Sequence, residues 1–534
     1  MNKFENMLQT TRQHPVGGSN KHENRSHTMR RRPRMNSGIK FGTGGWREII
    51  ADGFTKANVQ ILAKALVAMM DEEAERYEEA ERYEGAERYE EAERYEEAER
   101  YEEAEKGVVI GFDRRFLSDT AAQWAAEVFA AHGVPVRLIS KAAPTPLVMF
   151  EVKRTGLPYG MAVTASHNPA VYNGVKIFTK GGRDADEKVT RRLEGHINDV
   201  ARAPQSIPYA DALAKGLIRE IDPQNEYIDC ILSSIDQKAI RDAGLHIALD
   251  PMYGVGRTSL QTILMTTRCN VDVIHERHDT LFGGRLPAPN VDTLRALQNY
   301  VIENGCDIGI ATDGDADRLG VIDEKGRFLH PNEILVILYY YLNKYKGRKG
   351  PAVRNLVTTH LLDRVAALFG EKCYEVPVGF KHVSSKMTET GAIIGGESSG
   401  GLTVEGHIPG KDGIYAASLL VEMIALTGEK LSEIWAEITG RTGALYSTEY
   451  GFRVSPDKKE ELIELLMRKK ELPDFPKEIS GVSYIDGCKV RFTDGGWLSI
   501  RFSGTEPLLR LTCETDDMHI NEALCGAMKS FCGM

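Results

Sequence analysis

A regular alternation of short extended runs with amphipathic helical runs most constrains how this 534-residue chain can fold. The apolar patterns predict strands at 108–112, 136–139, 160–163, 175–178, 245–250, 271–274 and 307–311, and helices at 120–131, 291–304 and from near Asn58 onward. Strands that alternate with helices indicate layered α/β domains. The last part of the chain differs, with strands at 482–485, 490–493, 497–502 and 509–514 before a final helix. That spacing predicts an α+β unit with an antiparallel sheet.

Length and composition exclude several classes of protein. A chain of 534 residues exceeds a single core, so three or four domains are expected. A mean hydropathy of −0.32 and the absence of any long apolar window argue against a membrane span, and the first residues lack the apolar segment of a secretory signal. The eight cysteines are scattered without a C-x-x-C pair, which is typical of reduced thiols in a cytoplasmic protein.

Residues 1–35 form a polar leader with a basic cluster at Arg30–Arg34. A basic tail can contact nucleic acid, but we favour a disordered leader, or a start at Met35, because the globular pattern begins directly afterwards. The net charge of −10 does not describe the folded part: residues 71–106 hold eighteen acidic and six basic side chains, and the rest carries +2.

Residues 72–105 repeat Glu-Glu-Ala-Glu-Arg-Tyr with a period of six. Glu residues four positions before Arg favour helix, but a six-residue period turns the tyrosines onto three faces in succession. Since no apolar stripe forms, a coiled coil is disfavoured. We expect a solvated helix, weakened at Gly85, that is a tolerated surface insertion; a partner-binding role is the alternative.

Ser166 lies on a short polar turn between two extended runs. Asn168-Pro169 and Asn173-Gly174 are turn signals on either side of it. Such a turn presents a hydroxyl as a nucleophile or phosphate carrier, and His167 and Lys176 are close enough in sequence to polarise it. An ordinary polar turn is the competing interpretation.

Asp313, Asp315 and Asp317 follow the strand at 307–311 at every second position. On an extended loop their carboxylates project to one side and repel unless a divalent cation neutralises them. Ligands that are all oxygen suit Mg²⁺, Ca²⁺ or Mn²⁺ and not zinc, and we favour Mg²⁺. An EF-hand loop is disfavoured because Arg318 occupies the position that requires Gly; a solvated acidic turn is the remaining alternative.

Three glycine-containing loops are weaker signals. Gly395–Gly401 holds Glu397 and Ser399, which can bond vicinal hydroxyls, with Lys381 and Lys411 in the same region. Arg501–Pro507 ends a strand and can cradle a phosphate, with Arg510 assisting from the next strand. Phe41–Arg47 is glycine-rich but fits no nucleotide-binding motif, and the chain has no Walker A sequence.

Taken in order, the segments 41–47, 164–169, 313–318, 396–400 and 501–505 resemble the α-D-phosphohexomutase superfamily, the phosphoglucomutase/phosphomannomutase group. The resemblance covers about residues 38–534 apart from the repeat, and it implies a heart-shaped, four-domain protein with its cleft where the domains meet. The expected parts are a leader (1–35), a phosphoserine domain (36–210, with the insert at 71–106), a metal-binding domain (211–325), a sugar-binding domain (326–440) and a phosphate-binding domain (441–534).

The resemblance also implies roles. Ser166 would be the phosphoserine and, with the three aspartates, a ligand of one Mg²⁺; Lys176, Arg318, Arg47 and His167 would assist catalysis. The expected substrate-binding residues are Glu397, Ser399, Lys381, Lys411, Arg501, Ser503, Gly504, Thr505 and Arg510. The implied activity is interconversion of hexose 1-phosphate and hexose 6-phosphate, with glucose 1,6-bisphosphate as activator and intermediate, in the cytoplasm and without nucleic-acid or membrane partners.

Departures from the family pattern bear on the sugar. Gly401 stands where many dual-specificity members carry His, and Gly379-Phe380-Lys381 looks like glucose-directed members. Glucosamine-phosphate members usually carry Asp and Ile where this chain has Gly44 and Trp46. Glucose is therefore the expected sugar, with a mannose or dual-specificity mutase as the alternative. A Mg-dependent sugar phosphatase and a non-catalytic scaffold are more distant alternatives, and the oligomeric state is left open.

Overall fold

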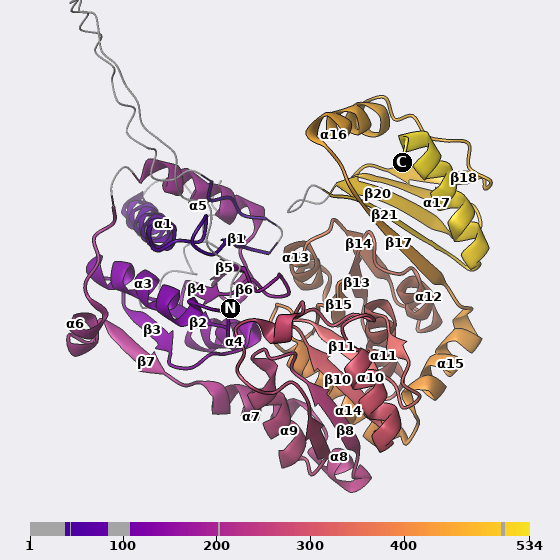
Figure 1. The fold of residues 1–534 in the computed structure, drawn as a ribbon, viewed down its shortest axis with the longest axis horizontal. Coiled ribbons are helices and arrows are strands. Elements are labelled where there is room, and N and C mark those ends of the chain that lie inside the picture. Colours follow the sequence, from indigo (N-terminus) through magenta and orange to yellow (C-terminus); the bar gives the residue numbers. More distant parts are fainter. Residues whose placement is uncertain (1–37, 43, 84–106, 201–202, 503–507) are drawn as a thin grey trace, which may run out of the picture. The chain divides into compact units, whose positions relative to one another are not determined.

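The computed structural model describes residues 38–42, 44–83, 107–200, 203–502 and 508–534, without the side chains of 77–83. These residues form four β-sheets that follow one another along the chain, each with its own helices (Figure 1). The first three sheets mix parallel and antiparallel pairing, and the fourth is antiparallel throughout. The predicted architecture of three mixed α/β units and a C-terminal α+β unit is confirmed.

The first sheet has the strand order β1-β5-β4-β2-β3-β7, with β6 beside β5. Its strands are β1 (Trp46–Ile49), β2 (Val108–Phe112), β3 (Val136–Ile139), β4 (Tyr159–Val163), β5 (Tyr172–Thr179), β6 (Arg183–Asp184) and β7 (Ile218–Ile221). Its helices are α1 (Lys56–Tyr83), α3 (Ser118–Ala131), α4 (Thr145–Thr155), α5 (Glu187–Asp199) and α6 (Tyr209–Ala214). The strands predicted at 108–112 and 136–139 are confirmed.

One local prediction in this sheet is wrong. Asn173-Gly174, which the sequence indicates as a turn, lies inside β5, where Gly174 pairs with Arg47 of β1. The glycine serves close strand approach, because a Cβ there would lie 2.2 Å from the Trp46 carbonyl oxygen.

The second sheet has the order β12-β11-β10-β8-β9. Its strands are β8 (His246–Asp250), β9 (Asn270–Val273), β10 (Ile308–Thr312), β11 (Leu319–Ile322) and β12 (Phe328–Leu329). Its helices are α7 (Gln224–Ser234), α8 (Gln237–Ala243), α9 (Gly256–Thr266), the short η1 (Phe282–Gly284) and α10 (Arg295–Asn304). Helix α10 begins four residues later than the pattern predicts, after a turn at 291–294.

The third sheet has the order β14-β13-β15-β16. Its strands are β13 (Ala352–Asn355), β14 (Cys373–Val376), β15 (Ile394–Gly396) and β16 (Leu402–Val404). Its helices are α11 (Pro331–Lys344), α12 (Leu361–Leu368), α13 (Phe380–Thr390), α14 (Gly413–Thr427) and α15 (Leu431–Thr442). Helices α11 and α14 are buried along most of their length, as helices that are apolar on every face must be.

The fourth sheet has the order β17-β21-β20-β19-β18. Its strands are β17 (Tyr446–Arg453), β18 (Ile479–Ser483), β19 (Cys488–Phe492), β20 (Trp497–Phe502) and β21 (Leu508–Thr515), with α16 (Pro456–Leu462), η2 (Ile463–Arg468) and α17 (Met518–Cys532). The sequence pattern missed β17, whose residues alternate between half-buried and exposed positions. It also placed β18 a few residues too late.

The first three sheets share one topological feature. In each, a strand with a parallel neighbour runs into a loop and returns as an antiparallel strand: β4 to β5, β10 to β11 and β15 to β16. The three connecting loops are 164–171, 313–318 and 397–401, which are the segments that carry the chemistry in the sequence. Loops at the carboxyl ends of strands in α/β sheets are where ligands usually bind.

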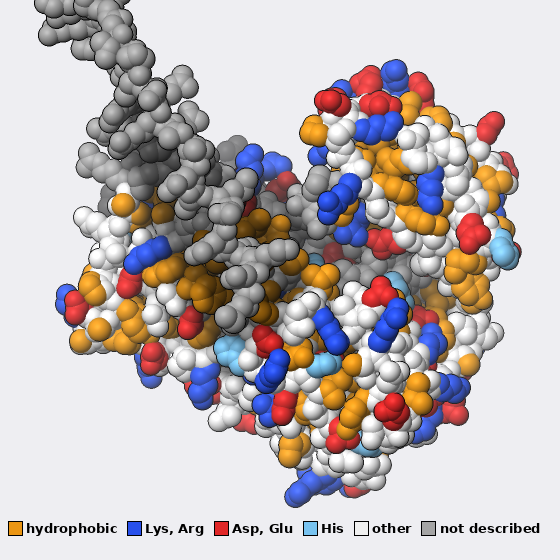
Figure 2. Space-filling model, viewed as in Figure 1, with side chains coloured by type: hydrophobic (Ala, Val, Ile, Leu, Met, Phe, Trp, Pro, Cys, Tyr) orange, Lys and Arg blue, Asp and Glu red, His pale blue; other side chains and the backbone are white. Residues whose placement is uncertain are grey.

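Helix α1 confirms the helix predicted near Asn58 and its buried face at Val59, Leu62, Ala63, Leu66 and Met69. It continues into the repeat as far as Tyr83; the rest of the repeat and the leader at 1–35 lie outside the described residues. Among the helices of the described part, none is long and apolar enough to cross a membrane. On the face drawn in Figure 2, acidic and basic side chains of the described residues are interspersed.

Candidate active site

Ser166 sits at the tip of the turn that joins β4 to β5, as the sequence predicts. Its backbone has φ of 54°, in the left-handed region that only glycine adopts freely, and the residue is fully buried. Its amide donates to Thr164 Oγ1 at 2.8 Å. Strained non-glycine residues of this kind concentrate at functional sites, because the surrounding contacts must hold them in place.

Arg115 is the main support of the Ser166 loop. Its buried guanidinium donates to the carbonyls of Ser166 (2.6 Å), Asn168 (2.7 Å), Pro169 (2.9 Å) and Tyr172 (3.0 Å). It also lies over the Phe282 ring, 4.9 Å from its centroid. The planar fork of an Arg side chain can bind several carbonyls in one geometry, which fixes the loop.

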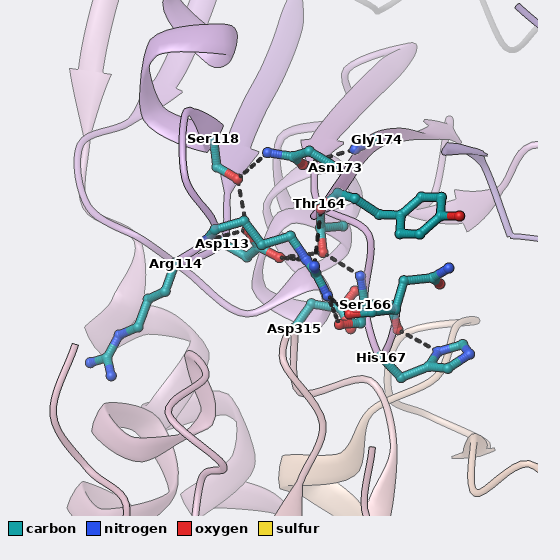
Figure 3. A network of polar contacts seen from close by, with 12 residues as sticks. Asp113, Arg114, Ser118, Thr164, Ser166, His167, Asn173, Gly174 and Asp315 are labelled. Atoms are coloured by element: carbon teal, nitrogen blue, oxygen red, sulfur yellow. Dashed lines mark hydrogen bonds and ion pairs between the residues drawn. The ribbon is translucent and has the colours of Figure 1, made fainter. Parts of the chain in front are cut away.

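Behind the loop lies a chain of buried hydrogen bonds (Figure 3). Thr164 Oγ1 donates to Asp113 Oδ2 at 2.6 Å, and Ser118 Oγ donates to Asp113 Oδ1 at 2.7 Å. Asn173 Nδ2 in turn donates to Ser118 Oγ at 2.9 Å. The network ties β5, the start of α3 and the Ser166 loop together.

The three aspartates lie together on the loop after β10. Their carboxylates are buried, and one oxygen of each lies within 4.8 Å of the others. The loop is a turn with left-handed Ala316 (φ 61°), so the prediction of an extended loop is wrong. The carboxylates converge because the chain coils around them, not because alternate residues of a strand share a face.

The aspartate loop and the Ser166 loop are in direct contact. Ser166 Oγ donates to Asp313 Oδ2 at 2.7 Å, and a Cβ on Gly314 would come within 2.7 Å of the Ser166 carbonyl oxygen. Thr145, at the start of α4, donates to Asp315 through both its amide (2.9 Å) and its hydroxyl (2.7 Å). The first two sheets therefore build this site jointly.

Cationic side chains surround the aspartates. Lys176 Nζ bridges Asp315 and Asp317 at 2.6 Å each, and Lys411 Nζ lies 2.8 Å from Asp317. Arg318 Nε lies 3.8 Å from the same carboxylate. Burial acts to raise the pKa of Asp317, but these three cations outweigh it and hold that pKa well below its usual range.

Asp313 behaves differently. Burial and the neighbouring Asp315 and Asp317 carboxylates raise the pKa of Asp313 well above its usual range. Burial alone would lower the pKa of Lys176, but Asp315 and Asp317 outweigh it and raise that pKa, so Lys176 stays protonated at neutral pH.

The donor set fits a hard divalent cation. Asp315 Oδ1 and Asp317 Oδ1 are buried and accept no hydrogen bond from the described residues. Buried carboxylate oxygens without donors are costly unless an ion uses them. An all-oxygen set of three carboxylates near a serine hydroxyl suits Mg²⁺ and not zinc.

His167 and Arg47 flank Ser166. His167 Nδ1 lies 3.3 Å from Ser166 Oγ, and burial together with Arg318 and Arg47 lowers the pKa of His167 well below its usual range, so the ring is neutral. Arg47 Nη1 donates to Asn168 Oδ1 at 2.9 Å from the end of the β1–β5 pair.

The loop 397–401 belongs to the third sheet. Glu397 accepts from Asn355 Nδ2 and from the Gly379 amide, both at 3.0 Å, while Ser399 is exposed. Lys381 is half-buried at the start of α13, two residues after Gly379. The absence of a side chain at Gly401 leaves room for the Lys411 side chain, because a Cβ at 401 would lie 2.2 Å from Lys411 Cδ.

The predicted phosphate loop is described only at its margins. Arg501, near the end of β20, pairs with Asp486 (3.2 Å), and Arg510 of β21 pairs with Glu449 (2.8 Å). Ser503, Gly504 and Thr505 lie outside the described residues. The described contacts thus join Ser166, His167, Lys176, Arg318, Arg47, Lys411 and the aspartates in one cluster, and leave Arg501 and Arg510 on the C-terminal sheet.

Sequence reasoning missed Arg115, Asp113 and Thr145. Asp113-Arg114-Arg115 directly follows a buried strand, at the same edge as the Ser166 loop, and this position is the signal that could have found them. Thr145 follows Pro144 at a helix start and carries no comparable signal.

Comparison with known proteins gives one consistent result. Profiles of four successive domains match: "Phosphoglucomutase/phosphomannomutase, alpha/beta/alpha domain I" at 94–203, domain II at 225–326, domain III at 330–441 and the C-terminal domain at 454–529.

Individual proteins agree. A phosphoglucomutase/phosphomannomutase of Thermococcus kodakarensis is 30% identical over 374 residues, which are 70% of this chain and 78% of the relative. A phosphoglucosamine/phosphogalactosamine mutase of Sulfurisphaera tokodaii is 29% identical over 72% of this chain and 83% of its own length. A crystal structure from Thermus thermophilus, described as a phosphomannomutase, has a TM-score of 0.75 at 28% identity and covers 94% of this chain and 100% of that one.

Proposed function

Because this chain belongs to the phosphoglucomutase/phosphomannomutase family, we propose that it interconverts the 1-phosphate and 6-phosphate of glucose by way of a phosphoryl group carried on Ser166. The chain is an intramolecular phosphotransferase, an isomerase, by virtue of that family. The observation that supports the proposal is the 2.7 Å hydrogen bond from Ser166 Oγ to Asp313, which brings a serine hydroxyl at the end of one sheet to a carboxylate cluster at the end of the next.

The chemistry is phosphoryl transfer by positioning and electrostatics. A phosphoryl group on Ser166 Oγ passes to a free hydroxyl of the sugar phosphate. The resulting bisphosphate reorients in the site, and its other phosphoryl group then passes to Ser166. Both transfers need the serine oxygen held in one place, which is what Arg115 and the strained turn provide.

Each side chain of the cluster has a proposed part. Asp313, Asp315 and Asp317 would hold Mg²⁺, which when bound would neutralise charge on the transferring group. Lys176, Arg318 and Arg47 offset the negative charge of the phosphoryl oxygens, and the neutral His167 ring can accept a hydrogen bond beside the serine. Lys176 and Lys411 together keep the pKa of Asp317 low, so this carboxylate stays ionised.

The sugar and its second phosphate would be held by the third and fourth sheets. Glu397 and Ser399 are proposed to bond sugar hydroxyls, and Lys381, Arg501, Ser503, Gly504, Thr505 and Arg510 to hold the phosphate that does not react. Such a site suits a sugar that reorients between two transfers, since either phosphate can occupy the same cradle. Glucose 1,6-bisphosphate is the expected activator.

Glucose is supported by the Gly379-Phe380-Lys381 pattern, whereas Trp46 does not separate glucose from glucosamine. The Trp46 side chain is buried and packs on Phe54, with ring centroids 5.7 Å apart, so it belongs to the core of the first sheet. Since relatives include a phosphoglucosamine/phosphogalactosamine mutase, the amino sugar must be compared directly.

The test is a coupled assay with glucose, mannose and glucosamine 1-phosphates, each with a trace of its bisphosphate. We expect the highest kcat/KM for glucose 1-phosphate and no net release of inorganic phosphate. Ser166→Ala should lower turnover at least about a thousandfold with an unchanged fold, whereas Ser233→Ala, on the surface of α7, should have no effect. Phosphate release that keeps pace with substrate loss would show a phosphatase instead.

Metal dependence is tested in the same assay. Chelation should abolish turnover and Mg²⁺ should restore it, and Asp315→Asn should weaken Mg²⁺ affinity by about tenfold or more, because it removes the charge of a ligand whose second oxygen has no other donor. Turnover that survives chelation would refute the proposed metal role. A separate measurement tests the phosphoryl carrier: mass spectrometry of the active enzyme should find Ser166 esterified.

A further inference from the structure

A second cluster of metal-binding side chains lies at the opposite edge of the second sheet from the aspartates. His246 opens β8, Asp272 lies in β9, and Cys306 stands two residues before β10. These are three adjacent strands of one sheet, with parallel β8 between its two neighbours (β8 and β10 are labelled in Figure 1). Asp272 pairs in register with Ala248, so His246 and Asp272 project from the same face.

The donor atoms already converge. His246 Nε2 lies 2.7 Å from Asp272 Oδ2 and 3.8 Å from Cys306 Sγ, and the three donors lie within 4.8 Å of one another. Tetrahedral zinc with Zn–S of about 2.3 Å and Zn–N of about 2.05 Å would separate sulfur from nitrogen by roughly 3.6 Å. The thiol and the imidazole therefore need almost no movement, and the carboxylate must withdraw by only about 0.7 Å.

The neighbouring Asp307 carboxylate has other partners. Asp307 accepts from the His246 amide at 2.9 Å through one oxygen and pairs with Lys430 through the other. Among the described residues, the candidate ligands are therefore His246, Asp272 and Cys306, and the Tyr300 hydroxyl, which hydrogen-bonds Asp272, lies beside them. The side chains of His246 and Asp272 are 25% and 37% exposed, so both a metal ion and a water ligand can reach the cluster.

The chemistry of these donors differs from that of the aspartate loop. A thiolate, an imidazole and one carboxylate favour Zn²⁺ and related transition metals, whereas three carboxylates favour Mg²⁺. We propose that His246, Asp272 and Cys306 form a second metal site, which binds Zn²⁺ with water as the fourth ligand. A bound ion would join β8, β9 and the segment just before β10, in the sheet whose opposite end presents Asp313, and would stabilise the folded chain by mass action.

Cobalt is the probe that distinguishes the two sites. Co²⁺ replaces Zn²⁺ with the same geometry, and only a thiolate ligand gives it an intense near-ultraviolet charge-transfer absorption; carboxylates give none. The full-length enzyme, saturated with Mg²⁺ and kept reduced with a phosphine, should develop this absorption and saturate at about one equivalent of Co²⁺. Zinc should then displace the cobalt and remove the absorption.

Variants assign the ligands. Cys306→Ser should abolish the absorption, and His246→Gln and Asp272→Asn should weaken Co²⁺ affinity about tenfold or more. The last two side chains are partly exposed, so these variants keep the test valid if Cys306→Ser does not fold. Cys269→Ser and Cys230→Ser are the matched controls and should leave the absorption unchanged.

Two results would overturn the proposal: no thiolate absorption from the wild-type enzyme, or an absorption that depends on Cys230 or Cys269 and not on Cys306. Neither result bears on the mutase activity, because the phosphoryl-transfer assay depends on Ser166 and the aspartates at the other edge of the sheet.

Discussion

The Arg115 guanidinium donates a 2.6 Å hydrogen bond to the backbone carbonyl of Ser166, a residue 51 positions further along the chain. Because the same group holds three more carbonyls of that loop, Arg115→Lys should misplace the serine oxygen. We expect kcat to fall about tenfold to a hundredfold with little change in KM. Loss of these hydrogen bonds, one of them to the buried Ser166 carbonyl, should also lower the free energy of unfolding by roughly 1–3 kcal/mol.

The neighbouring residue is the matched control. Arg114 points away from Ser166 in Figure 3, and its guanidinium donates to the Tyr253 carbonyl at 3.4 Å and to the Glu276 carbonyl at 3.2 Å. Arg114→Lys should leave kcat within about twofold of wild type. Equal losses in both variants would mean that general charge, and not the clamp on the loop, supports turnover.

Gly401 and Lys411 should behave as a coupled pair. A methyl group at 401 would displace the Lys411 stem and with it the 2.8 Å contact to Asp317, so Gly401→Ala should lower kcat/KM about tenfold. In a Lys411→Ala background the same substitution should have little further effect. The measurement is a double-mutant cycle on kcat/KM; strictly additive losses would contradict the coupling.

The start of the acidic repeat should be less dispensable than the sequence suggests. Glu73 accepts from the Tyr159 hydroxyl at 2.7 Å and from Arg192 at 2.8 Å, and Glu72 bonds His196 at 2.9 Å. Glu73→Ala should lower the free energy of unfolding by about 1–2 kcal/mol, because it removes the carboxylate that accepts from both the Tyr159 hydroxyl and the Arg192 guanidinium.

Removal of residues 84–105 tests the remainder of the repeat. A tolerated insertion predicts that the shortened enzyme keeps kcat/KM within about twofold of wild type. A large loss of activity, with an unchanged melting temperature, would instead favour a functional role for these residues.

Stability should fall in mild acid through His360. Burial, together with Arg354 and Lys489, lowers the pKa of His360 to about 4. Below about pH 6.5, the ordinary pKa of histidine, the unfolded chain binds a proton at this side chain that the folded chain does not bind. The free energy of unfolding therefore falls as the pH drops from about 6.5 toward 4. His360→Gln should remove up to about 2 kcal/mol of the loss between pH 7 and pH 5.

Trp497 offers a local probe of this effect, because its ring lies 5.5 Å from that of His360. Urea unfolding followed by tryptophan fluorescence at several pH values would show how steeply the free energy of unfolding falls with pH in wild type and in His360→Gln. Identical pH profiles for wild type and His360→Gln would rule out His360 as the source.

Residues whose chemistry is local could be found from the sequence, and residues that act through distant backbone could not. Ser166 and the three aspartates can be identified from the sequence because each lies on a turn that follows a buried strand. Arg115 acts on carbonyls more than fifty positions away, and Thr145 on a loop 170 positions away, so no short pattern contains either contact.

Tertiary pairing also overrode local preference. Asn173-Gly174 is a strong turn signal, yet the pairing of β1 with β5 draws both residues into a strand, and the glycine is used for its lack of a side chain. The alternation of strands and helices predicted the layered units correctly, because burial on one face sets that period. Strand β17 was not predicted from the sequence, because exposed and half-buried positions alternate along it and its pattern is only weakly apolar.

The hydroxyl of Ser166 meets its carboxylate partner across 147 positions of chain. During synthesis a ribosome must therefore release the segment that contains Asp313 before the serine can gain this neighbour. A nascent chain stalled earlier would present the Ser166 loop alone, without the carboxylate that accepts its hydrogen bond.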